Sequence, residues 1–438
     1  MKPYSERTTE ELLQEKQELE AKFEDARGKG LKLDMSRGKP STEQLKISRG
    51  ILDAIDSTSD LNCASGQDCC NYGLMDGIPE AKQLFADLLE VSPENVIVYG
   101  NSSLNIMYDT ISRAYTHGIL GNTPWCRLDS VKFLCPVPGY DRHFSVTEHF
   151  GVEMIHIPMD ENGPDMDLVE QYVNRDPAVK GIWCVPKYSN PTGITYSDEV
   201  VRRMASLKPA AADFRIYWDN AYAFHHLYDE VQDEIPEILS ECAKAGNPDM
   251  VYEFCSTSKI SFPGGGLAAL VSSETNLKEV RAQMTIQTIG HDKLNQLRHV
   301  RYFKNAQGVR EHMKKHADFM RPKFETVLQV LEKELGGLEI GSWVRPRGGY
   351  FISFDALPGC AKAIVAKSKE AGLVLTGAGA TYPYGKDPQD SNIRIAPTYP
   401  TPEELALAGE IFVLSVKLVS LEKILAERAQ REAREAAN

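Results

Sequence analysis

Short runs of β-branched and aromatic residues alternate with helical stretches through the middle of this chain, and this alternation restricts the fold more than any other feature. The runs have the length of strands, and seven occur: 95–99, 131–135, 152–157, 181–185, 214–218, 251–255 and 267–271. Strands that alternate with helices are typical of a mostly parallel sheet sandwiched by helices. The sequence therefore predicts an α/β fold with a seven-stranded sheet. Such sheets bind ligands at the carboxyl ends of their strands, so functional residues are expected just after each run.

The two ends of the chain differ from this middle part. Thr8 and Glu11 have the spacing of a capping box, which predicts a helix over residues 10–26 that stops near Gly28. After residue 310 the pattern changes to helices at 312–335 and 402–432 and strands at 349–354 and 393–396. This pattern predicts a smaller α+β lobe at the C-terminal end.

These segments predict three parts of the chain. Residues 1–45 form an N-terminal helix and a covering segment that packs with the small lobe, residues 46–310 form the large domain, and residues 311–438 form the small α+β domain.

The charge balance limits the partners. Lys and Arg total 49 and Asp and Glu total 62, a formal net charge of −13. Because binding to nucleic acid or to an anionic membrane usually needs a basic face, neither partner is expected. No stretch approaches the roughly 20 apolar residues that cross a bilayer, and residues 1–20 lack the pattern of a signal peptide.

The nine cysteines form no CxxC pair, and we interpret them as reduced, mostly buried thiols of a cytoplasmic protein. The adjacent Cys69 and Cys70 lack a His or a third Cys at ligand spacing, so no metal site is predicted.

Polar motifs follow four of the predicted strands. They are Gly100-Asn101-Ser102-Ser103, Asn190-Pro191-Thr192-Gly193, Asp219-Asn220-Ala221-Tyr222 and Ser256-Thr257-Ser258-Lys259. Each alone has an ordinary explanation as a turn, a helix cap or a solvated loop. Their order and spacing say more, since Asp219 lies 29 residues after Asn190 and Lys259 lies 40 after Asp219.

This order, with a late arginine at 394, resembles the fold type I pyridoxal-phosphate (PLP) enzymes of the class I aminotransferase group. The resemblance covers nearly the whole chain, from Ser36 to about residue 400. Three segments look like the bacterial aspartate aminotransferases of the Ic subgroup, which are related to the aminotransferase-like half of MocR regulators. These segments are Ser-Arg-Gly-Lys-Pro at 36–40, Asn-Tyr-Gly-Leu-Met-Asp-Gly at 71–77 and Asn-Ile-Arg-Ile-Ala-Pro-Thr at 392–398.

The resemblance implies a PLP-dependent transferase fold with residues 46–310 as the cofactor-binding domain. Lys259 would form the Schiff base with the cofactor aldehyde and later move a proton. Asp219 would keep the ring nitrogen protonated so that the ring acts as an electron sink. Asn190 and Tyr222 would donate hydrogen bonds to the ring's anionic oxygen, and Tyr140 would stack on the ring.

The cofactor phosphate is expected at a helix start. Backbone N–H groups of Ser102 and Ser103 would bind it, and the hydroxyls of Ser256 and Ser258 would add to the site. Tyr72 resembles the family tyrosine that reaches the phosphate of the neighbouring subunit, which implies a homodimer with shared active sites.

One departure from the family concerns this phosphate. Most relatives carry an arginine about eight residues after the lysine, whereas residues 262–268 read Phe-Pro-Gly-Gly-Gly-Leu-Ala. Either backbone N–H groups of this loop replace the arginine, or another cation reaches the phosphate.

Substrate recognition is expected to need cations. Arg394, 135 residues after Lys259, would clamp the α-carboxylate with its guanidinium, and the backbone of Gly38 would contact the same group. Lys39 is the first choice among several cations for a side-chain carboxylate; the others are Arg37, Arg142, His143 and Lys187.

The resemblance favours transfer of the amino group of L-aspartate to 2-oxoglutarate by a ping-pong reaction, giving oxaloacetate and L-glutamate. The alternatives are a transaminase of alanine or aromatic amino acids, or a PLP lyase on the same fold. A MocR-like ligand-sensing regulator is a more remote alternative, because such proteins need a DNA-binding domain and only about 30 residues precede Ser36.

Overall fold

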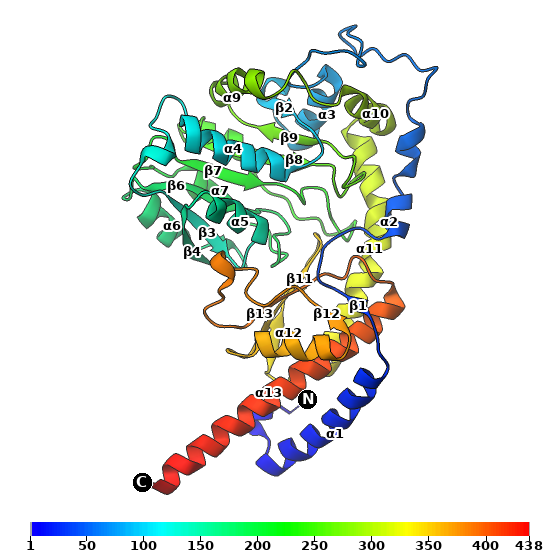
Figure 1. Cartoon of the computed structure of the whole chain (residues 1–438), viewed down its shortest axis with the longest axis vertical. Helices are drawn as coiled ribbons and strands as arrows, with labels where there is room; N and C mark the ends of the chain where they lie inside the picture. Colours follow the sequence, from blue (N-terminus) through cyan, green and yellow to red (C-terminus); the bar gives the residue numbers. More distant parts are fainter. Residues whose placement is uncertain (1, 438) are drawn as a thin grey trace.

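The computed structural model describes residues 2–437 and contains one large sheet with a smaller lobe beside it (Figure 1). The strand order of the large sheet is β2-β9-β8-β7-β6-β3-β4-β5. Its strands are β2 (Val96–Val98), β3 (Lys132–Val137), β4 (Glu153–Asp160), β5 (Gly163–Pro164), β6 (Val179–Cys184), β7 (Arg215–Asp219), β8 (Val251–Ser256) and β9 (Ala268–Val271).

The seven predicted strands are confirmed, and the sheet is mostly parallel. Strands β4, β3, β6, β7 and β8 pair in parallel, whereas β9 runs antiparallel between β8 and β2. An eighth strand, β5, adds a two-residue antiparallel edge beside β4. Because the parallel strands share one direction, their carboxyl ends meet at a single edge of the sheet.

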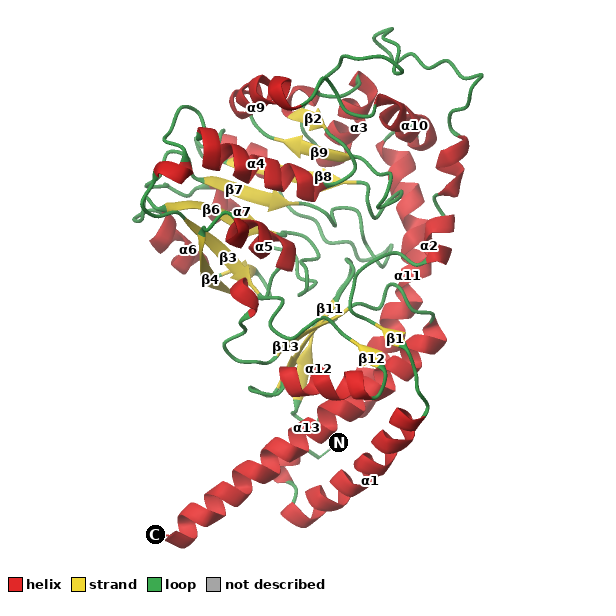
Figure 2. Cartoon of the chain, in the orientation of Figure 1, coloured by secondary structure: helices red, strands yellow, loops and turns green. Residues whose placement is uncertain are grey.

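Helices cover both faces of the sheet (Figure 2). Along β6, Trp183 packs into a cluster with α4, α5 and α9, whereas the neighbouring Ile182 and Cys184 pack into a cluster with α6, α7 and α8. This alternation follows from the two-residue side-chain period of a strand. The helices are α3 (Pro79–Leu89), α4 (Ser103–His117), α5 (Asp141–His149), α6 (Met166–Val173), α7 (Asp198–Ala205), α8 (Ile238–Lys244), α9 (Glu274–Gln287) and α10 (Lys293–Phe303).

The smaller lobe is built around a separate core. Its antiparallel sheet has the order β10-β11-β13, and β1 and β12 form a two-stranded parallel pair. The strands are β1 (Leu33–Asp34), β10 (Gly341–Trp343), β11 (Ile352–Ala356), β12 (Leu373–Val374) and β13 (Asn392–Ile395). The helices are α1 (Thr9–Gly28), α2 (Thr42–Lys46), α11 (Ala306–Leu335), α12 (Ala361–Glu370) and α13 (Pro402–Ala437).

Helix α11 connects the two cores. Ala306, Val309 and Met313 pack with the helices of the large domain, whereas the half from Met320 to Leu335 packs in the core of the small lobe. The helix begins six residues earlier than the predicted one at 312.

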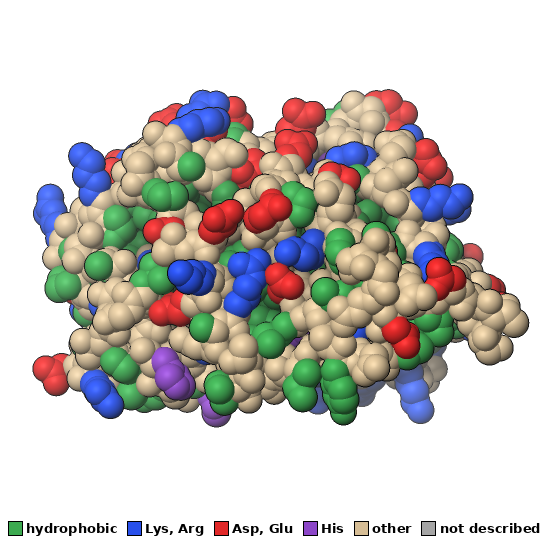
Figure 3. Space-filling model, turned by 90° about the horizontal axis from the view of Figure 1, so that it is seen from above, with side chains coloured by type: hydrophobic (Ala, Val, Ile, Leu, Met, Phe, Trp, Pro, Cys, Tyr) green, Lys and Arg blue, Asp and Glu red, His purple; other side chains and the backbone are tan. Residues whose placement is uncertain are grey.

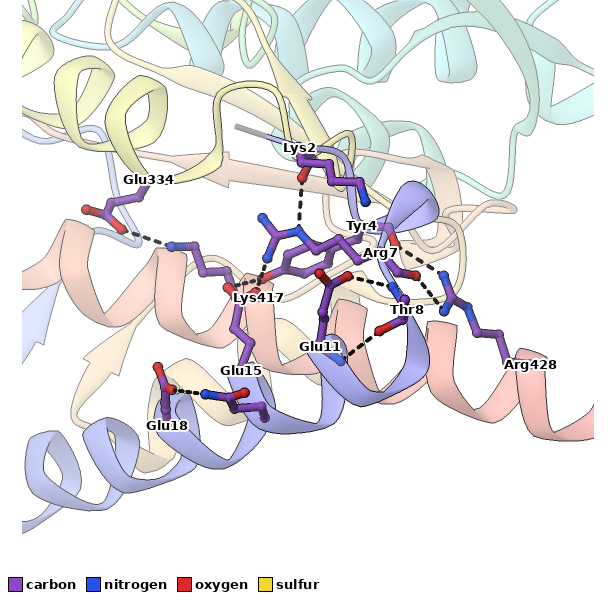
Figure 4. Close-up of polar contacts among 11 residues, drawn as sticks. Lys2, Tyr4, Arg7, Thr8, Glu11, Glu15, Glu18, Glu334, Lys417 and Arg428 are labelled. Atoms are coloured by element: carbon purple, nitrogen blue, oxygen red, sulfur yellow. Dashed lines mark hydrogen bonds and ion pairs between the residues drawn. The ribbon is translucent and has the colours of Figure 1, made fainter.

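The N-terminal helix α1 lies beside α13 (Figure 1). The capping box of Thr8 and Glu11 is confirmed, with both reciprocal hydrogen bonds present. Tyr4 donates a hydrogen bond to Glu15, and the Arg428 guanidinium of α13 donates to the backbone oxygens of Tyr4 and Arg7 (Figure 4). These bonds hold the start of the chain on the small lobe.

On the end of the molecule seen in Figure 3, Lys and Arg side chains are interspersed with Asp and Glu. Within residues 2–437, no helix combines the length and the apolar character that crossing a bilayer requires.

Candidate active site

The motifs that follow β2, β6, β7 and β8 meet at one edge of the large sheet. Asn190 follows β6, Asp219 ends β7 and Lys259 follows β8. Ser102 is the residue before α4, which begins at Ser103 after β2. The parallel topology thus brings together residues that are far apart in the sequence.

Asp219 is a buried carboxylate in which one oxygen is hydrogen-bonded and the other has no partner among the described residues. It is 3% exposed, and its Oδ2 lies 2.9 Å from His143 Nε2. The imidazole of His143 stacks on Trp183 with 4.3 Å between the ring centroids. The buried Oδ1 has no hydrogen-bond partner among residues 2–437. A buried carboxylate oxygen without a donor is costly, so Oδ1 fits the protonated ring nitrogen of a bound pyridine.

Lys259 presents an amine in a largely apolar, aromatic environment. Its Nζ lies 5.1 Å from the ring centroid of Tyr222 and 5.7 Å from that of Tyr350. Burial lowers the pKa of Lys259, and the carboxylate of Asp219 opposes part of this shift. A larger fraction of the amine is therefore neutral than in a solvated lysine, and the neutral amine is the nucleophilic form.

Tyr222, which lies beside this lysine, and Asn190 are both buried. Burial raises the pKa of Tyr222 well above its usual value, so its hydroxyl stays protonated and can donate a hydrogen bond. The Oδ1 of Asn190 accepts a hydrogen bond from Arg394 Nη1 at 3.2 Å. Tyr140 precedes α5, and its ring packs edge-on against His143 at 4.9 Å.

The small lobe contributes Arg394, on β13, to the site. Its guanidinium donates to Asp141 Oδ1 at 2.8 Å and lies 4.8 Å from the ring of Phe351, while its buried Nε has no acceptor among the described residues. The ring of Phe351 also lies against Gly38, since a Cβ built on Gly38 would be 2.4 Å from Phe351 Cζ. Gly38 and Arg394 therefore share one aromatic neighbour.

The start of α4 presents unsatisfied donors. Ser102 makes no side-chain capping bond, which leaves N–H groups of the first turn free for an anion. Ser256 is buried at the end of β8, and Ser258 donates its hydroxyl to the carbonyl of Asn101 at 3.0 Å. Together with the free oxygen of Asp219 and the amine of Lys259, these groups fit pyridoxal 5′-phosphate.

Two predicted residues, Tyr72 and Lys39, have exposed side chains. Tyr72 is 75% exposed and projects from the loop before α3. Lys39 is exposed, and its Nζ lies 4.0 Å from the ring centroid of Tyr399. Its ammonium group therefore makes a cation–π contact and not an ion pair with a carboxylate of the described residues.

Sequence reasoning missed some residues at this site. The sequence predicts His143 only as one of several cations for a side-chain carboxylate, whereas the structure pairs it with Asp219. The available signal was its position three residues after Tyr140, one helical turn along the same face. Nothing in the sequence pointed to Asp141, Tyr350 or Phe351.

The sequence is similar to that of known aminotransferases. The family model described as aspartate amino-transferase matches residues 7–428. An aspartate aminotransferase of Corynebacterium glutamicum is 47% identical over 410 residues, which cover 93% of this chain and 94% of that protein.

Solved structures give the same result. An aspartate transaminase from Corynebacterium glutamicum has a TM-score of 0.92 at 46% identity, over 94% of this chain and 97% of that one. LysN, an α-aminoadipate aminotransferase from Thermus thermophilus, has a TM-score of 0.69 at 19% identity, over 90% and 94% of the two chains, and shares the fold. With the family model matched over most of its length, the chain belongs to the aspartate aminotransferase family.

Proposed function

We propose that the chain is a PLP-dependent aspartate aminotransferase that moves the amino group of L-aspartate to 2-oxoglutarate. The observation that carries the proposal is the pair formed by Lys259, an amine with a lowered pKa, and Asp219, a buried carboxylate with one free oxygen. The 47% identity to the aspartate aminotransferase of Corynebacterium glutamicum supports the choice of substrate.

Bound PLP supplies an electron sink for the electrons that remain when the substrate Cα loses its proton. Lys259 would hold the cofactor through Nζ, and the same amine would accept and return the proton of the substrate Cα. Asp219 Oδ1 would keep the ring nitrogen protonated, and His143 fixes the orientation of the carboxylate through Oδ2.

The remaining cofactor contacts use neutral donors. The hydroxyl of Tyr222 and the amide of Asn190 would donate to the ring oxygen, and the ring of Tyr140 would pack against the cofactor. The N–H groups of Ser102 and Ser103 would bind the phosphate together with the hydroxyl of Ser256, and the hydroxyl of Ser258 would join them by giving up its hydrogen bond to the Asn101 carbonyl.

The substrate carboxylates are bound by side chains from the other parts of the chain. Arg394 binds the α-carboxylate with the help of the Gly38 backbone, which requires Arg394 to exchange its contact with Asp141 for the substrate. Lys39, which makes no ion pair within residues 2–437, is the candidate for the side-chain carboxylate.

We also propose a homodimer with shared active sites. Ile286 is 90% exposed, and Ile289 and Tyr72 are exposed as well. The segment of Ile289 lies beside the loop of Tyr72, since a Cβ on Gly290 would be 2.9 Å from the carbonyl oxygen of Gly73. Exposed apolar residues grouped in this way fit a contact with a second copy, to which Tyr72 would contribute.

A cytoplasmic location is proposed because all nine cysteines are free thiols in the described chain.

The test is the visible spectrum of the purified protein with PLP, recorded before and after addition of L-aspartate. Aspartate should convert the bound cofactor to its amine form, and 2-oxoglutarate should reverse the change. A spectrum that responds to alanine or an aromatic amino acid and not to aspartate would refute the substrate assignment. Failure to bind PLP at all would refute the proposed function.

A further inference from the structure

The loop that follows Lys259 is tied to the start of α4 but contains no cation. Asn101 Nδ2 donates to the carbonyl of Pro263 at 3.2 Å, and Ser258 Oγ donates to the carbonyl of Asn101 at 3.0 Å. The next three residues, 264–266, are glycines. These two hydrogen bonds hold the loop beside the start of α4.

Arg298 of α10 lies against this loop. A Cβ built on Gly265 would be 3.8 Å from Arg298 Nη2, which is ordinary van der Waals contact. Asn295, one turn earlier on α10, connects the two: its Oδ1 accepts from Arg298 Nη2 and its Nδ2 donates to the carbonyl of Gly266 at 2.9 Å. The side-chain amide of Asn295 thus positions the guanidinium and is hydrogen-bonded to the loop as well.

The guanidinium of Arg298 has no anionic partner among the described residues. Arg298 forms no ion pair with any carboxylate of residues 2–437, and its buried Nε has no acceptor there. A half-buried cation with an unpaired N–H is costly, and it has donors left for an anion that is not part of this chain.

We propose that Arg298 is the cation that binds the phosphate of the cofactor at the start of α4. The inference rests on the proposed function, because that function places PLP at this edge. A phosphate monoester carries about −1.5 to −2 charges at neutral pH, whereas a helix N-terminus contributes roughly +0.5. The serine hydroxyls are neutral, and Lys259 uses its amine for the aldehyde. The guanidinium of Arg298 supplies the missing positive charge, and its planar fork suits phosphate oxygens.

The test is an equilibrium titration of the cofactor-free protein with PLP and, separately, with pyridoxal, which lacks the phosphate. Binding to Lys259 is followed by absorbance. Arg298→Gln should weaken PLP binding about 10- to 100-fold, as expected for loss of a charge-assisted hydrogen bond, and leave pyridoxal binding unchanged. Arg310→Gln, a change at an exposed arginine of α11, is the matched control and should alter neither affinity.

A second variant guards against a folding defect. Arg298→Lys keeps the charge but loses the fork, so its PLP affinity should lie between those of the wild type and Arg298→Gln. Equal PLP affinity in all variants, or an equal loss for PLP and pyridoxal, would overturn the assignment. A wild-type protein that binds neither compound would instead overturn the proposed function, and this assignment with it.

Discussion

Replacing Gly38 by alanine tests how tightly the covering segment fits the site. The new Cβ would lie 2.4 Å from Phe351 Cζ and 2.8 Å from Cε1, whereas ordinary contacts are 3.4–4 Å. Either the ring or the segment must therefore move by about 1 Å. Phe351 is 5% exposed and lies under the guanidinium of Arg394, so it has little room to move away.

Overpacking of this kind costs about 1–3 kcal/mol. The displacement also moves a group that is expected to contact the α-carboxylate, and a 1 Å misplacement can cost up to 10²-fold in rate. We expect kcat/KM for aspartate to fall about 10- to 100-fold in Gly38→Ala, measured by steady-state kinetics with 2-oxoglutarate.

Two controls make the test specific. Gly28→Ala, at the end of α1, places a Cβ with nothing within 4 Å and should leave kcat/KM unchanged. In a Phe351→Leu background, Gly38→Ala should cost less than it does in the wild type, because the smaller side chain relieves the overlap. Full activity of Gly38→Ala, or the same loss in both backgrounds, would refute the reasoning.

Three further predictions concern single residues. Lys259→Ala should abolish transamination and leave PLP held only without a covalent bond; ordinary turnover would contradict its role. Arg394→Ala should raise KM for all amino acid substrates about 10- to 100-fold, and an unchanged KM would mean that another group binds the α-carboxylate. Glu253, which is 2% exposed and accepts a hydrogen bond from Asn220, has its pKa raised by burial to about 8. Because the folded state then binds a proton that the unfolded state has lost, this group lowers the free energy of unfolding as pH rises from about 4.5 to 8. Glu253→Gln should therefore gain stability relative to the wild type between pH 5 and pH 8, by at most about 4 kcal/mol in urea unfolding; a pH-independent difference would show that the carboxyl group stays ionised.

The sequence could predict the elements whose side-chain pattern is long enough to read. The seven runs of the large sheet are such elements, and so is α1 with its capping box. It could not predict β5 or the pair β1 and β12, because each has only two residues and no period can be recognised over that length. Strand β10 has the sequence Gly-Ser-Trp, which contains no β-branched residue to mark it as a strand. These short strands owe their pairing to the elements that bring them together, and not to their own residues.

The same limit applies to the site. The predicted residues follow strands, whereas the residues that were not predicted reach the site through contacts between distant parts of the chain. Lys259 and Asp219 could be located because Asp219 ends one strand of a parallel sheet and Lys259 follows the next, so topology fixes which edge they share. His143 lies 76 residues from Asp219 in the chain, and Asp141 lies 253 residues from Arg394. Neither pair has a local pattern, since each depends on where α5 rests on the sheet and where the small lobe closes. Arg298 belongs with them: a loop without a cation shows that a charge is missing, but only the packing of α10 shows which residue lies beside that loop.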